Sequence, residues 1–245
     1  MTENLLTERF AAFDRNYQAI MEQIALAAGQ AGRKPEEVTL LAATKTVPVE
    51  VINYAISRGL QCIGENRVQE LLDKYDAVDH AGCDVQFIGQ LQTNKVKYLM
   101  GKVSCIQSVD SRKLAGEISR LCQKDGRTMD VLVEVNIGGE ENKGGVAPER
   151  LLEFVDEIRA LPGLRVKGLM TVPPICSDEK ELGRYFSKMR QYYVDIKGKS
   201  MDNVDMACLS MGMSADFPVA IRHGANMVRV GSLLFGARDY GPMAG

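Results

Sequence analysis

Residues 38–45 read VTLLAATK, and Pro48 follows just before a helix-like stretch. The first seven residues carry no charge and are mostly apolar, which is typical of a strand buried on both faces of a parallel sheet. Lys45 closes the run, so it lies at the carboxyl end of the strand and can point into a pocket. A partly desolvated amine loses its proton more readily and can form a Schiff base with an aldehyde. A single lysine at a strand end is more often a solvated surface residue, so its role depends on the rest of the chain.

Two later segments supply that context. Residues 209–216 read LSMGMSAD and residues 226–236 read NMVRVGSLLFG, so each is a strand that runs into small or hydroxylated residues. Backbone N–H groups at such turns, with serine hydroxyls beside them, form a cradle for an anion. In (β/α)8 barrels the phosphate site is commonly built from the loops after strands seven and eight. The two segments fall where those strands are expected, and together they predict a phosphate site.

The chain alternates strand-like and helix-like stretches. Strands are predicted near residues 38–44, 62–65, 85–89, 105–109, 130–137, 166–172, 205–211 and 227–231. Helices are predicted at residues 3–32, 49–58, 67–75, 94–100, 112–123, 148–161, 179–196 and 217–223. Eight strands separated by helices indicate an α/β fold, a (β/α)8 TIM barrel with an additional N-terminal helix. A doubly wound open sheet is the alternative, although no G-x-G-x-x-G follows the first strand.

Length and composition agree with one barrel. The 245 residues match the roughly 250 typical of this fold and predict a single domain over 1–245. The 30 basic and 32 acidic residues leave no electrostatic footprint for nucleic acid or an anionic membrane. No run of 18 apolar residues appears, and the N-terminus lacks the pattern of a signal peptide, so we expect a cytoplasmic protein. The six cysteines show no C-x-x-C spacing, which argues against a zinc site and against a disulfide framework.

Polar residues also follow or end the other predicted strands. Capping of the next helix explains some of them, notably Thr93 and Ser111. The polar Glu134 and Asn136 and the apolar Met170 lie inside predicted strands, and we expect them to face the barrel interior. An unpaired Glu there would destabilise the fold. The glycine-rich residues 138–145 lack the Gly-Lys-Ser/Thr of a nucleotide-binding loop, so we interpret them as a flexible loop over the pocket. His80 and His223 are interpreted as structural residues.

Six motifs occur together and in order: AATK at 42–45, IGENR at 63–67, FIGQLQTNK at 87–95, GLMT at 168–171, LSMGMS at 209–214 and VRVGS at 228–232. As a set they closely resemble the pyridoxal phosphate homeostasis protein family, single-barrel relatives of the alanine racemase N-terminal domain. The resemblance covers nearly the whole chain. Gln90 is a departure, because many relatives carry His there. An amide can donate a hydrogen bond but cannot act as an acid near neutral pH, so the resemblance supports no proton-transfer role for Gln90.

The resemblance implies a set of cofactor-binding residues. Lys45 resembles the residue that holds pyridoxal 5'-phosphate (PLP) as a Schiff base. Ser214, Gly231 and Ser232 match phosphate-binding positions, with Ser210 a further candidate. Arg229 matches an arginine beside the pyridine nitrogen, where a guanidinium cannot accept a proton and its charge disfavours a pyridinium. Finally, Asn66 matches a polar residue lining the pocket, and Met170 resembles an apolar wall.

Three functions compete at this point. The resemblance favours a non-catalytic protein, expected to be a monomer, that holds PLP and delivers it, with PLP-dependent apo-enzymes as partners. A PLP-dependent amino-acid racemase is the alternative. It needs a second acid–base residue opposite Lys45, which alanine racemase draws from a C-terminal domain. Here the chain ends fourteen residues after Gly231, and Tyr240 is the one tyrosine beyond the last predicted strand. A third reading is a cofactor-free barrel whose Lys45 forms a Schiff base with a sugar phosphate.

Overall fold

The computed structural model describes residues 2–176 and 178–236. Its eight parallel strands close into a barrel in sequence order, and β8 pairs with β1 through Leu40↔Val228 and Leu41↔Arg229. The strands are β1 (Thr39–Ala43), β2 (Cys62–Glu65), β3 (Asp84–Phe87), β4 (Cys105–Val109), β5 (Met129–Glu134), β6 (Leu164–Met170), β7 (Val204–Met213) and β8 (Met227–Val230). The closed barrel confirms the predicted fold class and excludes the open sheet.

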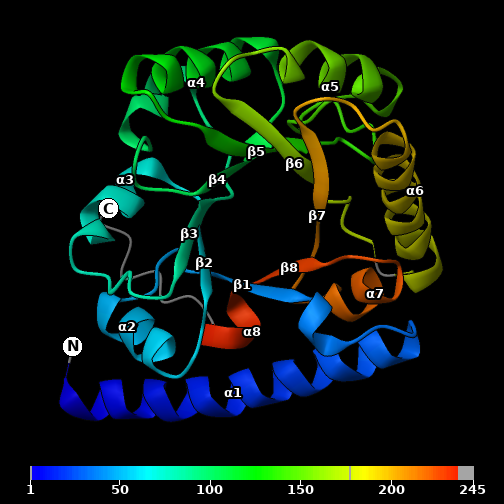
Figure 1. The fold of residues 1–245 in the computed structure, drawn as a ribbon. Helices are drawn as coiled ribbons and strands as arrows, with labels where there is room; N and C mark the ends of the chain where they lie inside the picture. The colour runs from blue at the N-terminus through cyan, green and yellow to red at the C-terminus, as the bar shows by residue number, and fades with distance from the viewer. Residues whose placement is uncertain (1, 177, 237–245) are drawn as a thin grey trace.

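Helices surround this barrel. The α-helices are α1 (Glu3–Gln30), α2 (Val49–Ser57), α3 (Val68–Tyr75), α4 (Arg112–Asp125), α5 (Leu151–Arg159), α6 (Glu179–Gly198), α7 (Phe217–Arg222) and α8 (Ser232–Phe235). Short 3-10 helices in the described ranges are η1 (Pro35–Glu37), η2 (Thr93–Tyr98) and η3 (Pro148–Arg150). Figure 1 shows α1 running along the outside of the ring, where it packs against α2, α7 and α8. The additional N-terminal helix is therefore an outer cover for the side where the barrel closes.

The predicted elements are present, with a few corrections. The stretch 94–100 is a 3-10 helix, η2, and no capping hydrogen bond from a side chain precedes it among the described residues, so the capping role expected of Thr93 is wrong. The expected cap at Ser111 is present, since its side chain accepts the N–H group of Leu114, and Asp178 caps α6 in the same way by accepting the N–H group of Lys180. The fifth strand ends at Glu134 and not at 137, which places Asn136 in the following loop.

The core has two layers. A large apolar cluster, including Ile52, Phe87, Phe186 and Phe217, joins the outer side of the strands to the helices. Two small clusters consist of residues on or next to strands, and we assign them to the barrel interior: Leu41, Cys62, Ile88 and Met227 in one, Cys105, Leu132 and Met170 in the other. Polar side chains share that interior, among them Gln86, Gln107, Ser210 and Arg229. The barrel is thus a packed core whose centre is partly polar.

A bulge in β7 shapes the carboxyl end of the barrel. Ser210 pairs with Met227 and Met213 pairs with Arg229, so three steps along β7 match two along β8. Gly212 lies in this bulge at φ 97°, and a Cβ there would come within 2.6 Å of the Ala220 Cβ. A bulge re-aims the chain that follows it. Here it carries Ser214 toward the end of β8. Among the described residues, no helix combines the length and apolarity needed to cross a membrane.

Candidate functional site

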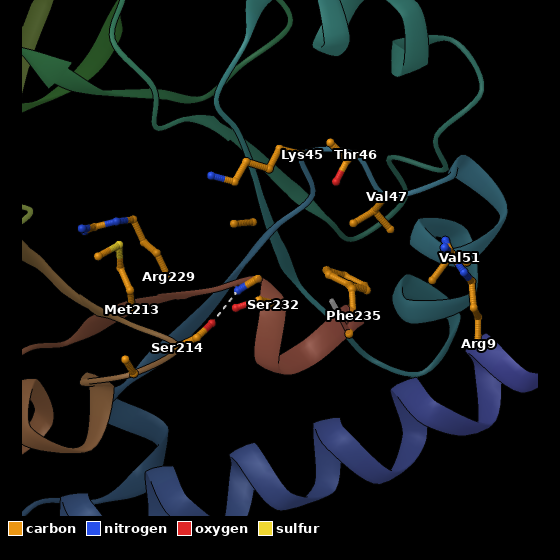
Figure 2. Close-up of a pocket in the computed structure, with 14 residues that line it drawn as sticks. Arg9, Lys45, Thr46, Val47, Val51, Met213, Ser214, Arg229, Ser232 and Phe235 are labelled. Atoms are coloured by element: carbon orange, nitrogen blue, oxygen red, sulfur yellow. Dashed lines mark hydrogen bonds between the residues drawn. The ribbon is translucent and has the colours of Figure 1, made fainter. Parts of the chain in front are cut away.

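A cavity of about 280 Å³ opens beyond the carboxyl ends of β1, β7 and β8. It brings together five of the predicted residues, Lys45, Ser214, Arg229, Gly231 and Ser232, which are far apart in the sequence. Its other lining residues are Arg9, Ala43, Thr46, Val47, Val51, Met213, Ala215, Phe235 and Gly236. Figure 2 shows the Lys45 side chain extending toward the side of the cavity where Arg229 and Met213 lie, with Ser214 and Ser232 close together at another edge. In α/β barrels, this end of the strands carries the active site.

The turn that carries Lys45 is fixed on its amino-terminal side. Lys45 lies two residues beyond β1, and the buried Thr44 precedes it. The Thr44 hydroxyl donates to Glu65 Oε1 at 2.6 Å, and the Lys74 amine donates to the Thr44 carbonyl oxygen at 2.9 Å. Burial raises the pKa of Glu65, and the nearby Lys74 opposes that shift. Residues from β2 and α3 therefore determine where the backbone of Lys45 lies.

The same turn is fixed on its other side. Thr46 adopts φ 63°, in the left-handed region that non-glycine residues rarely occupy. Its backbone N–H donates to Glu70 Oε1, which also accepts from Lys74 at 2.6 Å. Strained backbone of this kind persists where the surroundings hold it in place and is frequent at functional sites. Glu70 and Lys74 thus hold the peptide groups on both sides of Lys45.

Backbone donors converge at the edge of the cavity formed by β7 and β8. The N–H groups of Gly231 and Leu233 both donate to Ser214 Oγ, each at 3.3 Å. Gly231 packs closely on β1, since a Cβ there would lie 3.2 Å from the Ala43 carbonyl oxygen. Ser232 is exposed beside them. Two N–H groups that meet on one oxygen form the kind of pocket that accepts a phosphate oxygen.

Arg229 forms another wall of the cavity and is only 5% exposed. Its guanidinium donates to Ser210 Oγ at 2.6 Å and to the Thr171 carbonyl oxygen at 2.7 Å. Burial lowers the pKa of Arg229 to about 10, while the charges of Glu134 and Asp216 oppose that shift. Arg229 therefore remains a cation at neutral pH. Two of its five N–H donors hold it in place, and the others can serve a ligand.

Three predicted positions differ from expectation. Ser210 is fully buried, is bonded to Arg229 and does not line the cavity, so a direct phosphate contact does not fit its position. Met170 packs on Cys105 and Leu132 in the barrel interior and does not line the cavity either. Asn66 follows β2 and is not among the residues that line the Lys45 cavity, and its Oδ1 is buried without a hydrogen-bond partner among the described residues. Such an atom has the capacity to accept a hydrogen bond from a ligand or a water molecule.

A second cavity of about 260 Å³ lies beneath the glycine-rich loop. Gln90, Glu134, Asn136, Lys143 and Gly144 are among the residues that line it. The loop therefore covers this cavity, and the expectation that it covers the Lys45 pocket is corrected. Asn136 does not face the barrel interior, because its side chain donates to the Glu140 carbonyl oxygen at 2.9 Å and accepts the Glu140 N–H. Burial and the nearby Asp110 raise the pKa of Glu134 to about 7, and Arg229 opposes that shift.

Both histidines make local contacts away from the Lys45 cavity. His80 Nε2 lies 2.7 Å from the Tyr75 carbonyl oxygen, and His223 Nδ1 lies 2.8 Å from Ser187 Oγ. Burial lowers the pKa of His223. Each cysteine is present as a free thiol. Within the described parts of the chain, no group of three or more His, Cys, Asp or Glu side chains is arranged to hold a metal ion.

Several site residues were not anticipated from the sequence. Arg9 and Phe235 line the cavity from α1 and α8, and Glu70 and Lys74 hold the Lys45 turn. The last two are four residues apart on one helix face, a spacing that indicates an ion pair but not its target. Tyr240 lies outside the described residues.

Comparison with known proteins identifies the family of the chain and supports its fold. Residues 12–239 match the model of the family described as "Alanine racemase, N-terminal domain". A pyridoxal phosphate homeostasis protein of Aquifex aeolicus is 49% identical over 221 residues, which cover 90% of this chain and 96% of that protein. A crystal structure of an unknown protein from Bifidobacterium adolescentis superposes with a TM-score of 0.87 at 35% identity, covering 96% of this chain and 97% of the other.

PipY of Synechococcus elongatus, solved with PLP bound, superposes with a TM-score of 0.76 at 30% identity. The match covers 87% of this chain and all of PipY. The solved relatives therefore agree with the barrel fold. The chain belongs to the pyridoxal phosphate homeostasis protein family, which carries the alanine racemase N-terminal domain.

Proposed function

We propose that this protein binds PLP in the cavity between β1, β7 and β8 and serves intracellular PLP homeostasis. The observation that carries the proposal is the convergence of three different chemistries in one cavity. Lys45 supplies an amine, Gly231 and Leu233 supply backbone donors, and Arg229 supplies a buried cation. The PLP bound to PipY and the names of the curated relatives support the same reading.

The residues fit the parts of PLP. The phosphate would accept the N–H groups of Gly231 and Leu233, which meet on Ser214 Oγ in the structure, and the hydroxyls of Ser214 and Ser232 would also donate to it. The Lys45 amine would hold the aldehyde carbon as a Schiff base, with its turn fixed through Thr44 and Thr46. PLP itself supplies an electrophilic aldehyde and an electron-withdrawing ring.

Arg229 supports a holding role over a catalytic one. A guanidinium donates hydrogen bonds and cannot accept a proton, so beside the pyridine nitrogen it keeps that nitrogen unprotonated. An unprotonated ring draws electrons weakly and stabilises a carbanion poorly. We therefore propose that the protein holds and releases PLP without strong turnover. In this proposal it acts as a cytoplasmic monomer, with PLP-dependent apo-enzymes as recipients.

Borohydride reduction tests this function. The purified protein incubated with PLP should absorb in the visible range, lose that band on reduction and carry a pyridoxyl group on Lys45 in peptide mapping. Lys45→Ala should abolish the label. Lys167→Ala is the control, because Lys167 pairs with Asp205 and is not part of the cavity. A label on another lysine only would contradict the assignment. A protein that stays colourless with PLP would favour the sugar-phosphate alternative.

The raised pKa of Glu134 and its proximity to Arg229 favour the racemase alternative. Its pKa of about 7 is suited to proton transfer at neutral pH, and it is close enough to Arg229 for their charges to interact. Deuterium exchange at Cα of an amino acid, lost in both Lys45→Ala and Glu134→Gln, would support catalysis. Exchange at the rate given by free PLP would support the holding function.

A further inference from the structure

A continuous series of hydrogen bonds crosses the interior of the barrel and ends at Arg229. Arg229 donates to Ser210 Oγ at 2.6 Å, and Ser210 donates to Gln107 Oε1 at 2.7 Å. The Gln107 amide donates to Gln86 Oε1 at 2.6 Å, and the Gln86 amide donates to Asp84 Oδ2 at 2.6 Å. The series starts at the cofactor cavity and reaches the first residue of β3, at the opposite end of the barrel. We refer to these five residues as the interior chain.

The charged ends fix the direction of every bond in the interior chain. Arg229 can only donate, and an ionised Asp84 can only accept. The Ser210 hydroxyl, which accepts from Arg229, must therefore use its hydrogen for Gln107. Gln107 then presents its oxygen to Ser210 and its amide nitrogen to Gln86, and the same nitrogen also donates to Met227 Sδ at 3.1 Å. This single orientation connects a cation to an anion without two donors or two acceptors facing each other.

Because the interior chain is buried, its polar groups depend on one another for hydrogen bonds. Gln107 and Ser210 have no exposed surface, and Gln86 is 7% exposed. A polar group buried here without a partner destabilises the folded protein, so one broken bond affects its neighbours. Bonds aligned in one direction also polarise one another. A substitution at one member is therefore expected to be felt at Arg229, even though Gln107 and Gln86 do not line the cofactor cavity.

We propose that Ser210, Gln107 and Gln86 are positioning residues that hold the Arg229 guanidinium toward the cofactor, with the Asp84 carboxylate as their distant anchor. The inference rests on the proposed function, since it takes Arg229 to face PLP. It explains why the barrel centre holds two glutamines and a serine where apolar side chains would otherwise pack. It also assigns Asp84, at the far end of the barrel, an influence on PLP affinity.

Four variants break the interior chain or rebuild it. Gln107→Leu and Ser210→Ala remove a link and should weaken PLP binding to the apo-protein by about tenfold or more. Gln107→Glu keeps the acceptor for Ser210 but presents oxygen to Gln86 Oε1, so it should also weaken binding. In the double variant Asp84→Asn with Gln107→Glu, Gln86 can turn its amide around, accept from the new amide at position 84 and donate to the new carboxylate at position 107. Every bond between members of the interior chain is then restored with the net charge unchanged, and affinity should return to within about threefold of wild type.

PLP affinity is measured by equilibrium titration of each apo-variant, with thermal unfolding recorded in parallel. Ser119→Ala is the matched control, because it removes a buried hydroxyl bonded to the Pro162 carbonyl oxygen outside the interior chain. A purely structural role would change unfolding but not the bound cofactor. In contrast, Gln107→Leu should shift the pH midpoint of the visible absorbance of bound PLP downward. A pyridine nitrogen that loses Arg229 can take up a proton, and its positive charge opposes protonation at the Lys45 nitrogen.

Wild-type affinity and an unshifted midpoint in Gln107→Leu and Ser210→Ala would overturn the inference, as would a double variant that binds PLP no more tightly than Gln107→Glu alone. If Gln107→Leu does not fold, the comparison of Gln107→Glu with the double variant decides. Different measurements would contradict the proposed PLP-binding function and the positioning role of the interior chain. If the proposed function is wrong, the wild-type protein itself shows no Lys45-linked PLP, whereas failure of this inference leaves wild-type binding intact and makes the variants equal to it.

Discussion

The Lys74 amine lies 2.9 Å from the carbonyl oxygen of Thr44, the residue that precedes Lys45. The same amine lies 2.6 Å from Glu70 Oε1, which accepts the N–H of Thr46 on the other side. With 15% of its side chain exposed, Lys74 is well shielded from water. One ion pair on α3 therefore controls the backbone on both sides of the proposed cofactor lysine, although neither partner lines the cavity.

Replacing Lys74 with Met should loosen this turn while keeping the length of the side chain. Hydrogen bonds to a charged group contribute about 1.5–3 kcal/mol, so we expect PLP affinity to fall by about tenfold or more, with slower formation of the Lys45 adduct. Equilibrium titration and borohydride trapping over time measure both effects. Lys167→Met removes a different ion pair, the one between Lys167 and Asp205, and should leave the affinity and the rate of adduct formation unchanged. Equal affinities in the two variants would show that the ion pair on α3 does not position Lys45.

Ser214→Ala tests the proposed phosphate site. In the proposed site the variant removes the hydrogen bond from the Ser214 hydroxyl to the phosphate, while the N–H groups of Gly231 and Leu233 remain as donors. At about 1.5–3 kcal/mol, PLP affinity should fall by about one to two decades without unfolding the barrel. Titration of apo-protein with PLP gives the affinity, and circular dichroism checks the fold. Ser57→Ala, at the end of α2, serves as the surface control. Unchanged affinity would remove Ser214 from the phosphate site.

The raised pKa of Glu134 predicts that the free energy of unfolding depends on pH. Its pKa in the folded state is about 7, above its ordinary value of 4.5, so the folded protein binds this proton more tightly than the unfolded chain. Below about pH 4.5 both states carry the proton, and Glu134 costs nothing. Between 4.5 and 7 the unfolded state ionises first and folding becomes less favourable, and above 7 the cost is constant. At about 1.4 kcal/mol per pKa unit, the full cost is about 3 kcal/mol.

Glu134→Gln should therefore stabilise the protein at pH 8 by up to about 3 kcal/mol relative to its effect at pH 5. The pKa of about 7 already includes the attraction to Arg229, which lowers it. Urea unfolding of variant and wild type at both pH values measures the difference. Glu149→Gln, at an exposed carboxylate, should show no such pH dependence. A gain that is the same at pH 5 and pH 8 would mean that the Glu134 pKa is ordinary in the folded state.

The fold could be predicted because apolar runs indicate buried strands and turn residues indicate where these strands end. The strand at 38–44 and the segments around 209–216 and 226–236 fell at β1, β7 and β8, and their order along the chain placed their ends together. The residue at which a strand ends was harder to predict. Asn136 follows Glu134 in an apolar context, but its side chain bonds Glu140 in the loop, and no local pattern distinguishes this from a strand continuing.

The site could be predicted only in part, because contacts across a barrel depend on register. Ser210 and Ser214 lie four residues apart in one motif, yet the bulge at Gly212 places one under Arg229 and the other in the cavity. The glutamines at 86 and 107 were a visible signal, since each interrupts an apolar strand. Which residue each one faces follows from the pairing of β3, β4 and their neighbours around the closed ring, which one sequence does not reveal.

Catalysis gives the last prediction. Racemisation needs a carbanion at Cα, an electron sink that stabilises it and a proton donor on the face opposite Lys45. In the proposed site Arg229 would oppose protonation of the ring, and a well-placed acid–base partner typically contributes about 10²–10⁴-fold in rate. We therefore expect the PLP-loaded protein to show little or no turnover of alanine or serine, with at most slow deuterium exchange at Cα. Chiral chromatography and proton NMR in D₂O measure these, with Lys45→Ala plus free PLP as the background. Rapid racemisation by the wild-type protein that disappears in Lys45→Ala would establish an enzyme instead of a carrier.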